Sequence, residues 1–244
     1  MGRLNWRVAE VVDVIHETQR TTSIVLALPG WPGHRAGQHV DVRLTAEDGY
    51  QAQRSYSISS SPEDGDRVAI TVERLDDGEV SPYLANELRV GDPLELRGPI
   101  GGYFTWTVAD GGPMYLIGGG SGVAPLMAML RHHAAQGSEI PVTLLYSVRT
   151  QDDVIFRDEL DRLAAGGNRQ VIYTLTRGQP DGWTGYRRRI DLEMLNAVIG
   201  PPTKDGIAYV CGPTSLVENV ATALVQMGFA ADRVRTERFG PTGG

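Results

Sequence analysis

The first hundred residues alternate short apolar-rich runs with turn-forming residues. Six runs read as strands, at 7–15, 22–28, 39–44, 54–59, 67–75 and 93–98. Gly, Pro and Asp cluster between them, as is typical of strand connections. One short helix is expected at 81–88, with Ser81 as its N-cap and Pro82 in its first turn. Short strands without long helices predict an antiparallel barrel or sandwich.

Beyond residue 110 apolar strands alternate with helical stretches. The strands are expected at 114–118, 141–148, 170–176, 207–212 and 233–239, and the helices at 124–137, 152–167, 191–200 and 214–228. Strand–helix alternation predicts a parallel sheet with right-handed crossovers. The sequence therefore predicts two domains, 1–108 and 109–244, the second an α/β domain with five parallel strands. The boundary falls in a glycine-rich segment, 98–113.

Composition narrows the function classes. The net charge of −7 over 244 residues argues against a general nucleic-acid or membrane-surface role. The single cysteine, Cys211, excludes an intramolecular disulfide and any four-cysteine cluster within the chain. No apolar run reaches about 18 residues, the length needed to cross a bilayer, and no histidine spacing matches a metal motif. We expect a cytoplasmic monomer that uses no metal and has no membrane or nucleic-acid partner.

Two glycine turns end strands of the predicted parallel sheet. The first, "GGGSGVAP", contains Gly119, Gly120, Ser121, Gly122 and Pro125. Glycines there would let the backbone approach a pyrophosphate at a helix N-terminus, although the spacing is not G-x-G-x-x-G. The alternative is an ordinary tight turn. The second, "CGP", contains Cys211, Gly212 and Pro213. Two such turns could flank one crevice, unless Cys211 is simply a buried small hydrophobe.

Polar and cationic residues follow two further strands. Ser147, Arg149 and Arg177 stand at neighbouring strand ends, and "YRRRID" (186–191) adds arginines. Converging arginines could bind a phosphate monoester; scattered surface arginines are the alternative. The segment "GEVSPYL" (78–84) could bind an anion or form a plain capped helix. In "RSYSISS" (54–60), strand alternation places Arg54 and Tyr56 on one face, which would suit a flat anionic ligand or an ordinary strand.

These pieces, in this order, resemble the ferredoxin–NADP reductase superfamily. "RSYS" is similar to its R-x-Y-[ST] flavin motif, and "GEVSPYL" to its G-x-x-S-x-x-L flavin-phosphate segment. "GPIGGYF" resembles the turn that closes its flavin barrel. "GGGSGVAP" and "YVCGP" resemble its nicotinamide segments, and "ERFG" its C-terminal E-x-F. The similarity covers residues from about 5 to 240 and implies a Greek-key flavin barrel followed by an NAD(P)H domain.

The resemblance implies roles for individual residues. Arg54 would bind flavin phosphate, Tyr56 would pack beside the isoalloxazine, and Ser57 would lie near flavin N5, which needs a bulge or an edge position because alternation turns Ser57 away from Tyr56. Ser57, Cys211 and Glu237 would surround the reacting atoms as positioning groups. The remaining implied flavin contacts are Ser55, Val72, Gly78, Val80, Ser81, Ser121 and Phe239. The implied NAD(P)H contacts are Gly119, Gly120, Gly122, Pro125, Ser147, Arg149, Arg177, Cys211, Gly212 and Pro213.

The function implied is transfer of hydride from NAD(P)H to a flavin and then of single electrons to a separate protein. FAD is expected rather than FMN, and NADPH rather than NADH, because no acidic residue ends the strand 141–148 to bind a ribose diol. With one cysteine, the iron–sulfur centre must be on a partner, such as a [2Fe–2S] ferredoxin serving an oxygenase or a cytochrome P450. The alternatives are reduction of a small molecule such as free flavin or quinone, and a flavin-bound relay or regulatory subunit without turnover.

Overall fold

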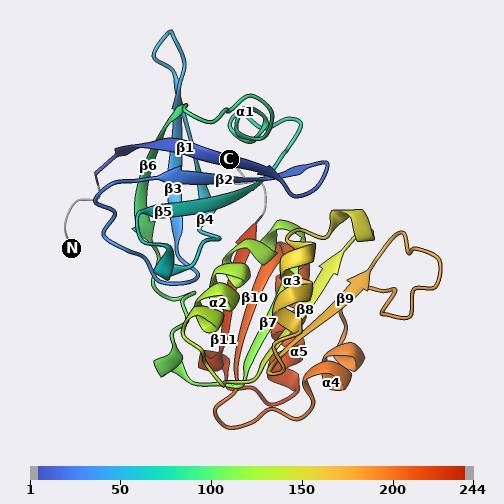
Figure 1. Cartoon of the computed structure of the whole chain (residues 1–244). Coiled ribbons are helices and arrows are strands. Elements are labelled where there is room, and N and C mark those ends of the chain that lie inside the picture. Colours follow the sequence, from blue (N-terminus) through green and yellow to red (C-terminus); the bar gives the residue numbers. More distant parts are fainter. Residues whose placement is uncertain (1–4, 240–244) are drawn as a thin grey trace.

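The computed structural model describes residues 5–239 and consists of two sheets with their helices (Figure 1). Six strands form the first sheet: β1 Arg7–His16, β2 Thr21–Ala27, β3 His39–Thr45, β4 Gln51–Ser57, β5 Arg67–Glu73 and β6 Pro93–Ile100. Their order is β4-β3-β6-β1-β2-β5, with antiparallel neighbours. An antiparallel bridge from Ile58 to Ile70 joins the two edges and closes the sheet into a barrel. The predicted fold of the first domain is confirmed.

The barrel is held together by an apolar interior. Side chains from all six strands and from the segment after β5 pack into one buried cluster that includes Ile24, Val40, Ile70 and Leu96. Alternate strand positions face this interior, as the period of two requires. A one-residue slip of any strand would turn its apolar set to solvent, so this cluster fixes the register of the barrel.

Strand β4, which ends at Ser57, is regular and lies at one end of the sheet order. Its pairing with β3 runs without a register shift from Gln51 to Ser57. The irregularities lie elsewhere, between His39 and Asp41 of β3 and between Val11 and Asp13 of β1. Strand β4 therefore ends the sheet order and contains no bulge, and its next residue, Ile58, bridges to Ile70 of β5.

The second domain is a parallel sheet between two helical layers. Its strands are β7 Met114–Gly119, β8 Val142–Val148, β9 Arg169–Leu175, β10 Ile207–Pro213 and β11 Val234–Phe239, in the order β11-β10-β7-β8-β9. Helices α2 Val123–Ala135 and α3 Arg157–Ala164 bury apolar residues against one face, and α4 Leu192–Ile199 and α5 Thr214–Gln226 against the other. The strand order reverses between β7 and β10, where the turns after both strands meet. Ligands of open α/β sheets bind at such switch points.

Two helix expectations are wrong in detail. Helix α1, Ser81–Asn86, has Val80 rather than Ser81 in the N-cap position, and the Ser81 hydroxyl accepts a hydrogen bond from the Leu75 N–H at 3.1 Å. The helix expected at 152–167 begins only at Arg157, because Phe156 adopts a left-handed conformation with φ of 60°. The 3₁₀ turns are η1 Pro62–Asp64, η2 Val108–Asp110, η3 Gly120–Gly122, η4 Gln151–Asp153 and η5 Ala231–Arg233.

The barrel sits over the carboxyl edge of the parallel sheet, toward which the arrowheads of β8, β9 and β10 point (Figure 1). Arg131 of α2 donates from Nη1 to the Ser59 carbonyl at 2.7 Å and forms a two-point pair with Glu159 at 2.6 and 2.8 Å. The Phe156 N–H donates to Glu17 Oε2 at 3.2 Å. The predicted division at 108/109 falls within η2, between the two sheets, and the glycine-rich tail 240–244 lies outside the described residues.

Candidate functional site

The turn after β7 is built so that backbone lies against backbone. Gly122 sits where a Cβ would be 2.3 Å from the Cys211 carbonyl oxygen and 2.7 Å from Gly212 Cα. Gly120 has φ of +54°, and its carbonyl accepts a hydrogen bond from the Tyr146 hydroxyl at 3.0 Å. Only glycine permits so close an approach without displacing main chain. The turn thereby presents its own N–H groups at the start of α2, where an anion can bind.

The two glycine turns pack against each other at the carboxyl edge of the sheet, and Cys211 is fully buried in the core cluster there. Cys211 of β10 pairs in register with Gly118 of β7 on one side and with Glu237 of β11 on the other. A Cβ on Gly119 would meet Leu216 and Pro213, so the "CGP" turn packs directly on the first turn. Glu73, at the end of β5, brings its Oε2 to 3.9 Å from the position of a Cβ on Gly120. The barrel and the glycine turn therefore meet at this edge.

Glu237 and Cys211 are adjacent groups held out of water. Burial raises the pKa of Glu237 to about 7, and Glu237 Oε2 is buried without a hydrogen-bond partner among residues 5–239. Burial, and then the charge of Glu237, raise the pKa of the Cys211 thiol. A thiol that stays protonated is a poor nucleophile. This pair can supply polarity and a proton-holding carboxyl, which agrees with a positioning role.

The barrel contributes a second unsatisfied oxygen. Ser57 is buried, and its hydroxyl has no hydrogen-bond partner within the described chain. Such atoms are rare in folded proteins, and each one suggests a missing ligand or water. Tyr56, one residue earlier, packs partly against the barrel core, and burial raises its pKa to about 12. A neutral aromatic side chain next to an unused hydroxyl fits a flat heteroaromatic ligand.

Other predicted flavin contacts are already engaged in the protein. Arg54 donates to Glu79 Oε2 at 2.7 Å, and the Ser55 hydroxyl donates to Asp41 at 2.7 Å. Val72 and Val80 lie in the barrel core, so only their main chain is available. A Cβ on Gly78 would meet Ser81 Oγ at 2.9 Å. The half-buried Phe239 packs beside the parallel-sheet core, and the half-buried Ser121 lies in η3.

The predicted NAD(P)H contacts gather at the carboxyl edge of the sheet. Ser147 of β8 is buried, whereas Arg149, directly after β8, and Arg177, two residues after the end of β9, are exposed. The Arg177 N–H donates to the Arg149 carbonyl at 2.9 Å, which ties the two strand ends together. Neither guanidinium has an ion pair or side-chain hydrogen bond among the described residues. Pro125 lies in the first turn of α2.

The arginine run 186–191 is mostly engaged elsewhere. Arg188 pairs with Asp191 at 2.7 Å and with Glu193 at 3.3 Å, and Arg187 donates to the Trp183 carbonyl. Tyr186 bridges to Thr174 and covers the open edge of β9. The run therefore closes a sheet edge, and the exposed Arg189 is the one arginine of the run whose side chain has no hydrogen bond or ion pair within residues 5–239.

Sequence reasoning missed Glu79 and Asp41, whose carboxylates bind the side chains of Arg54 and Ser55. Glu79 lies inside the quoted "GEVSPYL" segment. An acidic residue beside an expected phosphate site could have been recognised from the sequence. Asp41 gave no such signal, because its partner lies fourteen residues away on the neighbouring strand.

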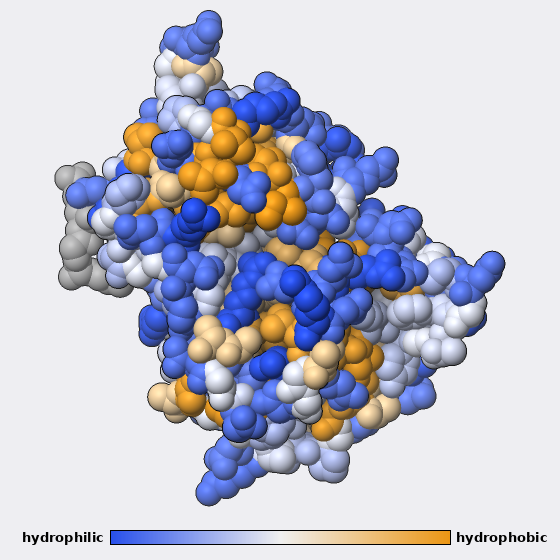
Figure 2. All heavy atoms as spheres, viewed as in Figure 1, coloured by the Kyte–Doolittle hydropathy of each residue, from blue (hydrophilic) through white to orange (hydrophobic). Residues whose placement is uncertain are grey.

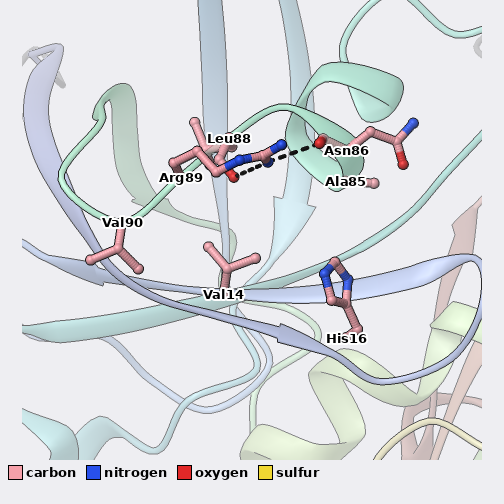
Figure 3. A pocket seen from close by; sticks show the side chains of 7 residues that line it. All are labelled: Val14, His16, Ala85, Asn86, Leu88, Arg89 and Val90. Carbon is pink, nitrogen blue, oxygen red and sulfur yellow. Dashed lines mark hydrogen bonds between the residues drawn. The ribbon is translucent and has the colours of Figure 1, made fainter.

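A separate hollow lies between α1 and β1. It measures about 370 Å³ and is lined by Val14, His16, Ala85, Asn86, Leu88, Arg89 and Val90 (Figure 3). None of the predicted site residues lines it. Apolar surface gathers over the barrel nearby, and hydrophilic side chains crowd the junction of the two domains (Figure 2). In residues 5–239 no group of three or more His, Cys, Asp or Glu is arranged to hold a metal, and no helix there is long and apolar enough to span a bilayer.

Comparison with known proteins identifies both halves. Residues 8–105 match the oxidoreductase FAD-binding domain and residues 116–222 the oxidoreductase NAD-binding domain. Ferredoxin–NADP reductase B of Sorangium cellulosum is 33% identical and matches over 84% of both chains. The glycine betaine monooxygenase reductase subunit of Pseudomonas aeruginosa is 31% identical over 95% of this chain, which spans 63% of that relative's length.

A solved structure shares the whole architecture. The FAD/NAD-binding domain of nitric oxide dioxygenase from Vibrio cholerae superposes with a TM-score of 0.84 at 29% identity, covering 96% of this chain and 99% of that one. The flavin and dinucleotide domains read from the two sequence patterns are thus confirmed as FAD-binding and NAD-binding domains.

Proposed function

The chain belongs to the ferredoxin–NADP reductase superfamily, and we propose that it takes hydride from NADPH and passes single electrons to a separate redox protein through bound FAD. The observation that carries this proposal is the Cys211–Glu237 pair, set at the switch point of a sheet whose carboxyl edge faces the barrel. When bound, the flavin supplies the hydride acceptor and releases electrons one at a time.

Residues of the barrel would bind the flavin, and residues of the second domain would bind the dinucleotide. Arg54 would hold the flavin phosphate, Tyr56 would pack on the ring, and the unpartnered Ser57 hydroxyl would donate to the reacting edge. The glycine turns would hold the dinucleotide pyrophosphate on the N–H groups of α2. Cys211 and Glu237 would exclude water and orient the nicotinamide, because orientation of two reactants is a large part of such catalysis.

The dinucleotide preference rests on the ends of β8 and β9. The buried Ser147 and the exposed Arg149 and Arg177 offer a hydroxyl and two cations at one edge, a set that suits the 2′-phosphate of NADPH. No acidic residue directly ends β8 to bind a ribose diol. We therefore propose NADPH as the preferred donor over NADH.

The electron acceptor is proposed from the relatives. One relative is by name the reductase subunit of a monooxygenase and another a ferredoxin–NADP reductase. We propose a [2Fe–2S] ferredoxin that serves an oxygenase or a cytochrome P450, and a monomeric chain in the cytoplasm, where the free Cys211 would stay reduced.

Cytochrome c reduction separates the candidate acceptors. With NADPH, the FAD-loaded protein should reduce cytochrome c rapidly only when a [2Fe–2S] ferredoxin is added. Equal rates without ferredoxin, together with fast reduction of free flavin or quinone, would favour the small-molecule reductase. Failure of NADPH and NADH to reduce the bound flavin would favour a relay subunit without turnover.

A further inference from the structure

An acidic side chain is bound to the arginine expected to hold the flavin phosphate. Glu79 lies in the loop between β5 and α1, and its Oε2 accepts from Arg54 Nη2 at 2.7 Å. Its other oxygen, Oε1, accepts from the Tyr50 hydroxyl at 2.8 Å. Both carboxylate oxygens therefore have a donor, and the carboxylate is fixed between the β3–β4 hairpin and the segment that leads into α1.

The carboxylate of Glu79 stays ionised at neutral pH. The hydrogen bond from Tyr50, and then the contact with Arg54, lower the pKa of Glu79. The pair is open to solvent, with the Arg54 and Glu79 side chains 44% and 50% exposed. An incoming phosphate would thus meet a cation whose charge is already matched by a neighbouring anion.

The two flavin cofactors would respond differently to this charge. The terminal phosphate of FMN is a monoester and carries about −1.5 to −2 at pH 7, whereas each phosphate of the FAD pyrophosphate carries a single charge. Coulomb repulsion scales with the product of the charges, so a carboxylate beside Arg54 penalises the monoester more. FAD also gains contacts through its adenosine half, which FMN lacks.

We propose that Glu79 is a specificity-determining residue that makes the flavin site prefer FAD over FMN. The inference rests on the proposed function, because it takes Arg54 as the residue that meets the flavin phosphate. Glu79→Gln removes the charge while its amide oxygen can still accept from Arg54 or Tyr50. Asp77→Asn is the matched control: it removes the same charge from the same loop, and Asp77 has no side-chain hydrogen bond or ion pair within residues 5–239.

The test is a titration of the flavin-free full chain with FAD and with FMN at low ionic strength. The change in flavin fluorescence on binding gives the Kd for each flavin. In Glu79→Gln, FMN binding should tighten about tenfold and FAD binding about twofold, so that the Kd ratio of FMN to FAD falls about fivefold. Asp77→Asn should change that ratio by less than about twofold, because exposed charges without contact couple weakly. Near 1 M salt, where the Debye length is about 3 Å, the Glu79→Gln effect should largely disappear.

Some outcomes would contradict only the proposed role of Glu79, and others would also contradict the proposed function. Flavin binding with the same FMN-to-FAD ratio in wild type and Glu79→Gln would overturn the inference alone, as would an equal change in Asp77→Asn or an effect that survives high salt. If the wild-type chain and Glu79→Gln bind neither flavin, the proposed function fails and this inference fails with it. Glu79→Ala serves as a second variant and should shift the ratio in the same direction.

Discussion

At the scale of single residues, two buried oxygens stand out because they have no partner. Ser57 Oγ and Glu237 Oε2 come from different domains, and both are buried without a hydrogen bond in residues 5–239. Folded proteins have few such atoms, and a ligand, an ion or a water usually accounts for each; Arg74 Nε and Arg97 Nε are buried in the same way among residues 5–239. Ser57 and Glu237 both belong to positions that the sequence motifs assign to the reacting centre. Substitution of each residue can be tested with two separate measurements, the stability of the fold and the rate of flavin reduction.

Ser57→Ala should slow flavin reduction without weakening the fold. The hydroxyl has no partner to lose, so the free energy of unfolding should change by less than about 1 kcal/mol. Loss of a positioned donor should slow anaerobic flavin reduction by NADPH about 10- to 100-fold in stopped-flow measurements.

Ser138→Ala is the matched control for this change. Ser138 is also buried, but its hydroxyl accepts from the Ile140 N–H at 3.3 Å, away from the site. It should lose about 1 kcal/mol of stability and keep the wild-type rate. A wild-type rate of flavin reduction in Ser57→Ala would remove Ser57 from the reacting centre.

Glu237→Gln should stabilise the flavin-free chain at alkaline pH. The folded pKa of about 7 lies above the ordinary value of 4.5, so folding favours the protonated form, and this contribution is lost as pH rises through 7. The advantage of the variant should be near zero at pH 4.5 and grow to about 1–3 kcal/mol by pH 8. Melting temperature against pH measures it.

Glu218→Gln controls for charge at the same end of the molecule. Glu218 lies on α5 and pairs on the surface with Arg238 at 2.6 Å. Its effect should be small and should not grow between pH 4.5 and 8. A pH-independent difference for Glu237→Gln as well would show that the carboxyl of Glu237 is not held neutral by burial.

At the scale of elements, the glycine turn after β7 is the most constrained piece. Gly122→Ala would force a methyl group to 2.3 Å from the Cys211 carbonyl oxygen, so either β10 or the start of α2 must move. We expect a loss of about 2–3 kcal/mol in chemical denaturation and weaker NADPH binding.

Gly102→Ala provides the comparison for Gly122. There a methyl group meets only the end of the Arg35 side chain, at 3.2 Å, and flexible side chains move at little cost. Its stability should stay within about 0.5 kcal/mol of wild type. Equal losses in both variants would mean that the close packing of the two glycine turns does not stabilise the domain.

The ends of β8 and β9 carry the choice of dinucleotide. Arg149→Ala with Arg177→Ala should raise the KM for NADPH about 10- to 100-fold, or about 1.4–2.7 kcal/mol in total, because both guanidinium groups are exposed and solvent weakens each contact below the usual value of about 1.5–3 kcal/mol for a charge-assisted hydrogen bond. The KM for NADH should stay within about threefold, because NADH lacks the 2′-phosphate.

Arg162→Ala, an exposed arginine on α3 that donates to the Asp158 carbonyl, should change neither KM. A parallel loss with both donors in the double variant would instead assign the two arginines to the pyrophosphate or to the fold.

Element types were predictable from the sequence because period and punctuation agree. Runs of period two bounded by Gly, Pro and Asp became barrel strands, and apolar runs followed by helical patterns became the parallel sheet. The misses arose where a side chain served something local. Ser81 accepts from the Leu75 N–H instead of capping α1, and the left-handed Phe156 delays α3. Neither choice is visible in hydrophobic periodicity.

At the scale of the whole molecule, the contact between domains could not be predicted. Arg131 bonds the Ser59 carbonyl, and the Phe156 N–H bonds Glu17. These pairs join residues far apart in the sequence, and no motif links them. The motifs did predict that the two glycine turns lie next to each other, because the order of strands in an α/β sheet brings them together.

The central claim is that NADPH reduces a flavin bound between these two domains, and an anaerobic visible spectrum tests it most directly. The FAD-loaded protein would be mixed with NADPH and, in a separate sample, with NADH, while the oxidised flavin bands are followed. The account predicts that the absorption bands of the oxidised flavin disappear with either dinucleotide, and that NADPH reduces the flavin faster than NADH does. A chain that binds no flavin after reconstitution with FAD or FMN, or a bound flavin that neither dinucleotide reduces, would contradict it.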